Sequence, residues 1–148
     1  MLNKKICIFG PPCVGKTTLA YTALKNKIPS FTTHDYNPSM WQSNEEFFTR
    51  ILNLDIPLFL DVGGKNIGWI DGGDDIKTVL LLPPRDVYLE RERMDIENIG
   101  EHRNQSGIQH YDDLMESKSE FDLVIEDVLS PQEIFDYIIE TMELKNEL

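Results

Sequence analysis

The stretch Gly10–Thr17 reads GPPCVGKT and matches the pattern G-x-x-x-x-G-K-[ST] in full. The apolar run Ile6–Phe9 precedes it, and the helix-forming stretch Thr17–Asn26 follows it. The expected context is therefore a strand, a glycine-rich turn and the N-terminus of a helix. Such a turn directs backbone N–H groups toward one point, and the helix dipole adds positive potential there. The stretch predicts a loop that binds the phosphates of a nucleoside triphosphate, and we call residues 10–17 the phosphate loop.

The residue types within the phosphate loop fit this chemistry. Gly10 and Gly15 permit the backbone conformations that a ring of N–H groups requires. We expect Lys16 to reach the β- and γ-phosphates and the Thr17 hydroxyl to bind Mg²⁺. Cys13 receives no catalytic role. The predicted nucleotide-binding residues are Gly10, Pro11, Pro12, Cys13, Val14, Gly15, Lys16, Thr17 and Thr18.

The composition predicts a single domain over residues 1–148, soluble and cytoplasmic. Apolar residues make up 41% of the 148 residues and charged residues 27%. No apolar run approaches the roughly 20 residues of a membrane span. The opening MLNKKICIFG is too short and too soon interrupted for a signal peptide. The two cysteines fit a reducing compartment better than a disulfide framework.

The charge is strongly acidic but unevenly spread. The formal net charge is −12, yet residues 1–34 hold five lysines and no acidic residue. A lysine-rich segment around the phosphate loop suits phosphate binding, whereas long nucleic acid needs clustered lysines and arginines on a wider surface. We therefore expect a small-molecule or nucleotide acceptor, no membrane and no long nucleic acid. The acidic remainder is equally explained by solubility.

Strand-like and helix-like segments alternate along the chain. Several apolar runs (PLFLD, TVLLL, LVIE) are nearly continuous, as expected of parallel strands covered on both faces. An amphipathic helix is expected over Pro38–Asn53, and another begins at the capping box Ser130–Glu133. The pattern predicts a three-layer α/β fold with a five-stranded parallel sheet. The expected strands are Lys4–Phe9, Ile28–Thr33, Ile56–Asp61, Ile76–Leu82 and Phe121–Glu126.

Two carboxylates follow predicted strands. Asp61 comes after four residues Pro57–Leu60, a pattern that places a carboxylate beside the Mg²⁺ ion, with Thr17 as the other protein ligand. The alternative is an aspartate that starts a turn. Asp35 follows the second strand and would face the crevice at the carboxyl end of the sheet. There it would orient the acceptor hydroxyl or take its proton, unless it only caps the next helix.

The arginines occur late in the chain. Arg91 and Arg93 lie on a charged helical stretch after the fourth strand, and Arg103 lies in the polar segment Gly100–Gly107, a candidate lid. Guanidinium groups compensate the charge that phosphoryl transfer spreads over the migrating group. We expect at least one of these three arginines to be catalytic. The alternative for the helical pair is a solvated face with ion pairs of little energy.

With these residues in view, the sequence resembles P-loop kinases of the adenylate kinase and shikimate kinase branch. The resemblance implies a P-loop NTPase fold and transfer of the γ-phosphoryl group of ATP, with Mg²⁺, to a nucleotide or other small acceptor. Shikimate kinases carry an aspartate after strand two, a Glu-x-x-Phe-Arg helix and a glycine run after strand three. The counterparts here are Asp35, Arg50 and the pair Gly63 and Gly64, which the resemblance implies as acceptor-binding residues. Arg50 is displaced by one position, and the glycine run has two members instead of three.

Two other interpretations stay open. The sequence His34–Tyr36, with Arg103 and Asn104, is similar to polynucleotide kinases, in which an aspartate in this context activates a 5′-hydroxyl. Asp61–Gly64 also matches the D-x-x-G of small GTPases, which would make the protein a regulatory GTPase or ATPase switch. The guanine-reading N-K-x-D pattern, however, is missing after the fourth strand.

Overall fold

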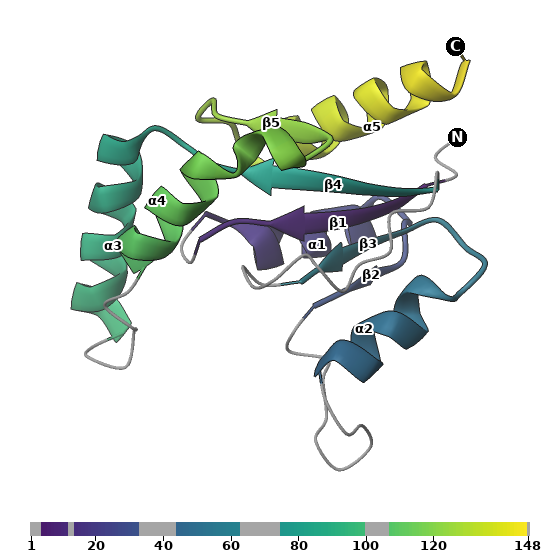
Figure 1. Ribbon diagram of the computed structural model, residues 1–148, viewed down its shortest axis with the longest axis horizontal. Coiled ribbons are helices and arrows are strands. Elements are labelled where there is room, and N and C mark those ends of the chain that lie inside the picture. The colour runs from purple at the N-terminus through teal and green to yellow at the C-terminus, as the bar shows by residue number, and fades with distance from the viewer. Residues whose placement is uncertain (1–3, 12–13, 33–43, 63–74, 100–106, 148) are drawn as a thin grey trace.

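The computed structural model describes residues 4–11, 14–32, 44–62, 75–99 and 107–147 (Figure 1). Strands and helices largely alternate along the described residues, as the sequence predicted, but β3 and β4 are consecutive elements, and so are α3 and α4. In chain order the elements are β1 (Lys5–Phe9), α1 (Lys16–Lys25), β2 (Ser30–Phe31), α2 (Asn44–Leu52), β3 (Leu58–Asp61), β4 (Ile76–Leu81), α3 (Arg85–Ile99), α4 (Gly107–Glu116), a short 3₁₀ helix (Lys118–Glu120), β5 (Leu123–Ile125) and α5 (Pro131–Glu147).

The strands form a five-stranded sheet in the order β2-β3-β1-β4-β5. Every pairing is parallel, so the carboxyl ends of all the strands meet at one edge. Strands β2 and β3 lie on one side of β1, and β4 and β5 lie on the other, so the chain crosses β1 after β3. In open α/β sheets, ligands bind outside the carboxyl ends at such a reversal. The topology therefore directs attention to the end of β1, which continues into the phosphate loop.

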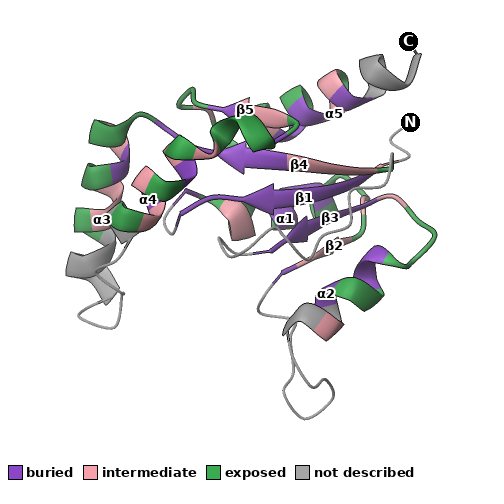
Figure 2. Cartoon of the chain, viewed as in Figure 1, coloured by how far each residue is buried: buried purple, intermediate pink, exposed green. Residues whose placement is uncertain are grey.

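Burial follows the order of the strands (Figure 2). Every residue of β1 and of β3 is buried, including Ile6, Phe9 and Leu60 at 0% exposure. These strands lie inside the sheet and are covered on both faces, which explains their nearly continuous apolar sequences. The three-layer α/β fold predicted from the sequence is confirmed.

The helices divide between the faces and the edges of this sheet. Helices α1 and α5 pack against each other, and α2 adds Phe48, Ile51 and Leu52 to the hydrophobic core. Helices α3 and α4 lie side by side beyond the end toward which the strands point (Figure 1). Among the described residues, no helix has both the length and the apolar character to cross a membrane.

Strand β2 is shorter than the predicted Ile28–Thr33, for a local reason. Lys27 adopts a positive φ of 66°, and the N–H of Ile28 still bonds to the carbonyl of Ala23, so the chain is leaving α1 at this point. Pro29 has no N–H to donate to a neighbouring strand. Pairing with β3 is therefore restricted to the carbonyl of Pro29 and to Ser30 and Phe31.

Helix α5 begins with the capping box that the sequence predicted. The Ser130 hydroxyl accepts the N–H of Glu133 at 3.1 Å, and the Glu133 carboxylate accepts the N–H of Ser130 at 2.9 Å. Two N–H groups that the first turn of the helix leaves unpaired are thereby satisfied. The bond from the Ser130 N–H holds the pKa of Glu133 below its ordinary value of 4.5. The stability that this hydrogen bond contributes is therefore present above pH 4.5 and is lost as the pH falls through the lowered pKa of Glu133.

We expect Ser130→Ala to reduce the free energy of unfolding at pH 7 by about 1 kcal/mol, because the N–H of Glu133 loses its acceptor. Urea unfolding followed by circular dichroism measures the change. Ser119→Ala is the control, since Ser119 is exposed on the 3₁₀ helix. Equal stability of the Ser130 and Ser119 variants would show that the capping box contributes nothing.

Candidate functional site

The phosphate loop turns sharply at Gly15. This residue has φ 91° and ψ 23°, a left-handed backbone conformation that residues other than glycine rarely adopt. Helix α1 begins at the next residue, and no side chain of the described residues caps its N-terminus or places an acidic group in its first turn. The first N–H groups and the positive end of the helix dipole consequently face the loop, and the first turn of α1 itself carries no acidic residue.

The Lys16 side chain folds back into the loop. Its ammonium Nζ donates hydrogen bonds to the carbonyl of Gly10 at 2.7 Å and to that of Pro11 at 2.8 Å. The side chain is half-buried, so these charge-assisted bonds are only partly screened by water. The positive charge is thereby held at the centre of the loop, beside the helix N-terminus.

Gly10 packs closely against the end of β4. A Cβ at this position would lie 2.9 Å from the carbonyl oxygen of Leu81 and 2.7 Å from Cγ2 of Val14. Val14 is itself part of the hydrophobic core at 5% exposure, so its side chain anchors the loop and only its backbone is available to a ligand. The close contact with Leu81 is a constraint that no pattern in the sequence indicates, because it links residues 71 positions apart.

Thr17 and Asp61 come together although 44 residues separate them. The Thr17 hydroxyl donates to the Asp61 carboxylate at 3.1 Å, and Asp61 is only 2% exposed. Their positions follow from the fold: Asp61 ends β3 beside Ile8 of β1, and Thr17 lies in the first turn of α1. A hydroxyl and a carboxylate are hard oxygen donors of the kind that Mg²⁺ prefers.

The described residues contain no other candidate metal centre. No group of three or more histidine, cysteine, aspartate or glutamate side chains gathers within them. Cys7 lies in β1 at 0% exposure, and burial raises the pKa of its thiol to about 12. The thiol is protonated at neutral pH and has no nucleophilic function.

The predicted arginines differ in their surroundings. Arg93 is exposed and forms an ion pair with Glu90 one turn earlier on α3, as expected of a solvated face. Arg50 on α2 is 65% exposed and lies 3.8 Å from Glu46 of the same helix. Arg91 on α3 is half-buried, and no described residue forms an ion pair with it. The surroundings of these arginines therefore favour Arg91 over Arg93 as the charge available to a ligand.

Several predicted site residues lie outside the described part of the chain. Their roles therefore stay predictions. The same holds for the candidate lid Gly100–Gly107, of which only Gly107, the first residue of α4, is described. The residues concerned are Pro12, Cys13, Asp35, Gly63, Gly64 and Arg103.

We expect Gly10→Ala to weaken nucleotide binding more than Gly15→Ala does, and to destabilise the fold. In the first variant the methyl group meets the backbone carbonyl of Leu81, and overpacking of this kind costs about 1–3 kcal/mol. In the second, the methyl group meets no atom within 4 Å, and the cost is the strained φ alone. Denaturant unfolding and titration with a fluorescent ATP analogue measure both effects. Equal stability of the two variants would contradict the close packing of the loop against β4.

No protein-family model matches the sequence, and no curated protein matches it. Solved structures match over nearly the whole chain. A gluconokinase from Sinorhizobium meliloti 1021 aligns with a TM-score of 0.68 and 13% identity, covering 99% of this chain and 95% of that chain. Shikimate kinase from Acinetobacter baumannii, in complex with shikimate, aligns with a TM-score of 0.65 and 16% identity, covering 98% and 95%.

The YorR protein from Bacillus subtilis, in complex with phosphorylated GDP, aligns with a TM-score of 0.60 and 18% identity, covering 98% of this chain and 99% of that chain. At these identities the likeness concerns the fold. The resemblance predicted from the phosphate loop is confirmed at that level: the chain has the three-layer fold of the P-loop kinases.

Proposed function

We propose that the protein is a phosphotransferase that moves the γ-phosphoryl group of ATP to a small acceptor. The observation that carries the proposal is the grouping of Lys16, Thr17 and Asp61 at the carboxyl end of a parallel sheet, beside the uncapped N-terminus of α1. This arrangement combines an ammonium group, oriented N–H groups and two oxygen donors within one loop and its neighbouring strand. Phosphoryl transfer depends mainly on positioning and electrostatic stabilisation, which such an arrangement supplies.

The same residues fit a nucleotide with Mg²⁺. Among the described residues, Thr17 and Asp61 are the proposed metal ligands, and Mg²⁺ in phosphate sites takes many of its ligands from substrate oxygens and water. A bound Mg²⁺ ion would neutralise charge on the β- and γ-phosphates. Lys16 would hold the same phosphates from within the loop, and Asp61 would orient the Thr17 hydroxyl through the hydrogen bond already present between them.

A small acceptor is the second element of the proposal. The similar structures include two enzymes named for small molecules, gluconokinase and shikimate kinase, and one protein bound to phosphorylated GDP. We propose a nucleoside monophosphate-like or comparably small acceptor, bound by Asp35, Arg50, Gly63 and Gly64. Asp35 would orient the acceptor group or take its proton. A cytoplasmic location and a lid around Arg103 belong to the same proposal.

Arg91 is the arginine that we propose for the transferring group. It lies on α3 at the carboxyl end of the sheet, and it is half-buried. Arg93, by contrast, forms its ion pair with Glu90 at the surface. A guanidinium that forms no ion pair with the described carboxylates is better placed to compensate charge that develops on a phosphoryl group.

We expect release of ADP from Mg²⁺-ATP to accelerate with one class of acceptor among nucleoside monophosphates, nucleosides, small sugar-like or shikimate-like alcohols and short 5′-hydroxyl oligonucleotides. Lys16→Ala should lower turnover by at least about 100-fold, because the ammonium group stabilises the transferring phosphates. Its thermal unfolding curve should stay close to that of the wild type. Slow hydrolysis that no acceptor accelerates would contradict the phosphotransferase and favour a nucleotide-dependent switch.

We expect Asp61→Asn to remove most of the effect of Mg²⁺ on nucleotide affinity. The amide keeps the size of the carboxylate but loses the charge that a divalent cation requires. Titration calorimetry with ATP, with and without Mg²⁺, should show at least about a tenfold loss of the Mg²⁺-dependent gain, or about 1.4 kcal/mol. Asp127→Asn is the control, since Asp127 is exposed outside the phosphate loop. An undiminished Mg²⁺ effect in Asp61→Asn would exclude Asp61 as part of the metal site.

A further inference from the structure

Helices α3 and α4 are held together by two buried tyrosines. Tyr88 of α3 is 0% exposed and Tyr111 of α4 is 1% exposed. Their rings are stacked, with centroids 5.0 Å apart and planes 19° from parallel. Tyr88 is the only buried residue among Arg85–Met94 of α3, so this ring pair is the principal apolar contact of the described part of that helix. An aromatic pair of this kind contributes about 0.5–1.5 kcal/mol beyond its buried area.

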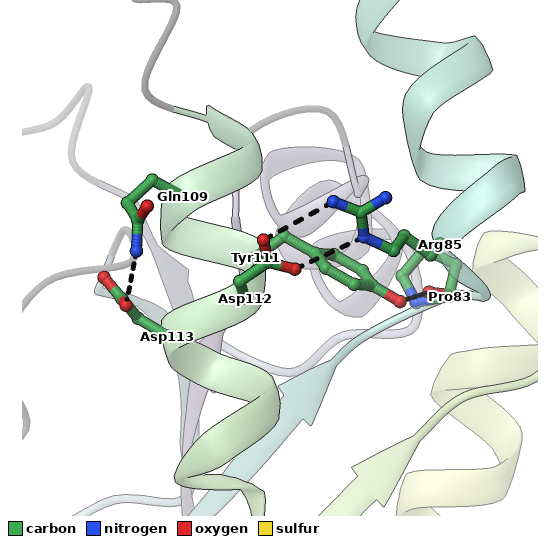
Figure 3. A network of polar contacts seen from close by, with 6 residues as sticks. All are labelled: Pro83, Arg85, Gln109, Tyr111, Asp112 and Asp113. Atoms are coloured by element: carbon green, nitrogen blue, oxygen red, sulfur yellow. Dashed lines mark hydrogen bonds and ion pairs between the residues drawn. The ribbon is translucent and has the colours of Figure 1, made fainter.

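Each phenol hydroxyl in this pair has a definite partner. The Tyr111 hydroxyl donates to the carbonyl of Pro83 at 2.7 Å, a buried bond from α4 to the end of β4 (Figure 3). The Tyr88 hydroxyl donates to the Glu92 carboxylate at 2.7 Å, within α3. Burial raises the pKa of Tyr111, so its hydroxyl stays protonated and continues to donate at neutral pH. We call Pro83, Tyr88 and Tyr111 the tyrosine joint.

An exposed ion pair lies beside the tyrosine joint. The Arg85 guanidinium donates to both carboxylate oxygens of Asp112, at 3.3 and 3.5 Å (Figure 3). Both side chains are about half exposed, so screening by water leaves this pair with little energy. The buried bond from Tyr111 to Pro83 is therefore the polar contact that fixes α4 to the sheet at this point.

The tyrosine joint is connected directly to the phosphate loop. The carbonyl of Leu81, the last residue of β4, limits the space at Gly10. The N–H of Leu82 bonds to the carbonyl of Ile125, which keeps the chain attached to β5 for one residue more. Pro83 follows at once, and its carbonyl receives the Tyr111 hydroxyl. Only Leu82 thus lies between the residue that contacts the phosphate loop and the residue that contacts α4.

Arg91 lies on the same helix as Tyr88 of the tyrosine joint. It follows Tyr88 by three residues on α3, and residues at this spacing are neighbours on one face of a helix. A change in how Tyr88 packs on Tyr111, or in the bond from Tyr111 to Pro83, would therefore also move Arg91.

We propose that Tyr111 is a positioning residue. Through its hydrogen bond to Pro83 and its stacking on Tyr88, it keeps α3, and with it Arg91, at a fixed position relative to the phosphate loop. The inference rests on the proposed phosphotransferase activity and on the function proposed for Arg91. It assigns a function to a residue that touches neither nucleotide nor acceptor.

The first test compares Tyr111→Phe with Tyr137→Phe. The Phe variant at 111 keeps the stacked ring and loses only the bond to Pro83, whereas Tyr137 is 47% exposed on α5 and is the matched control. We expect Tyr111→Phe to lower kcat about tenfold while the KM for ATP changes less than twofold. Tyr137→Phe should change neither. A fall in melting temperature with kcat unchanged would overturn the proposal and leave Tyr111 a structural residue only.

The second test is a double-mutant cycle with Arg91→Ala. If Tyr111 acts by positioning Arg91, the Arg91→Ala substitution should cost at least about fivefold less in kcat when Tyr111 is already Phe, because the two residues then act as a unit. Tyr137→Phe combined with Arg91→Ala should be multiplicative. Multiplicative effects in both pairs would show that Tyr111 and Arg91 are independent and would overturn the proposal.

A third readout separates this proposal from the proposed function. Native-state hydrogen exchange reports local opening without any turnover. We expect Tyr111→Phe to speed exchange at least about fivefold in both Tyr88–Met94 and Tyr111–Glu116, with α5 unchanged. If the wild type shows no phosphotransfer with any acceptor, the proposed function fails, and this exchange pattern still supports the tyrosine joint. Exchange unchanged in α3 would overturn the coupling between Tyr111 and α3, whatever the activity.

Discussion

The carbonyl of Leu81 lies where a side chain of residue 10 would have to begin, and much of the site depends on this contact. Because Gly10 has no Cβ, β1 can stay paired with β4 up to its last residue, Phe9, before the chain turns into the phosphate loop. The Lys16 ammonium group then donates hydrogen bonds to two carbonyls at the beginning of the loop, those of Gly10 and Pro11. A side chain at residue 10 would separate the loop from the sheet that orients it.

The opposite boundary of the site depends on a polar contact. Asp61 is almost completely buried at the end of β3, and a buried carboxylate is costly unless it is paired. The Thr17 hydroxyl supplies one such bond from the first turn of α1. Backbone packing against β4 and a hydroxyl–carboxylate bond to β3 thus hold the two ends of the loop by different forces.

The local parts of this arrangement could be predicted from the sequence. The turn at Gly15 into α1 and the capping box at Ser130 each depend on residues close together in the chain, and both are confirmed, as is the parallel sheet predicted from the apolar runs. Pairing Thr17 with Asp61 as ligands was also predicted, through the family pattern, and their contact is observed, although the metal function remains a prediction. Strand β2 begins later than predicted, because the left-handed turn at Lys27 has no clear signature in the sequence.

The contacts between distant elements could not be predicted. Arg91 and Arg93 look equivalent in the sequence, and only the structure shows that Arg93 is paired at the surface while Arg91 is half-buried. Tyr88 and Tyr111 carry no motif, and the chain between them includes the candidate lid. Their stacking depends on how two helices meet, which is a property of the packed fold.

The register of the sheet has a consequence for how the protein is made. Lys5 of β1 pairs with Leu58 of β3 and with Ile76 of β4, so during synthesis β1 finds its two neighbours only after these later strands have been made. Contacts of such long sequence separation slow folding, and an unpaired apolar strand such as KICIF can associate with other chains in the meantime. The strand that leads into the phosphate loop is thus the centre of the finished sheet and, until β3 and β4 have been synthesised, an apolar segment that can associate with other chains.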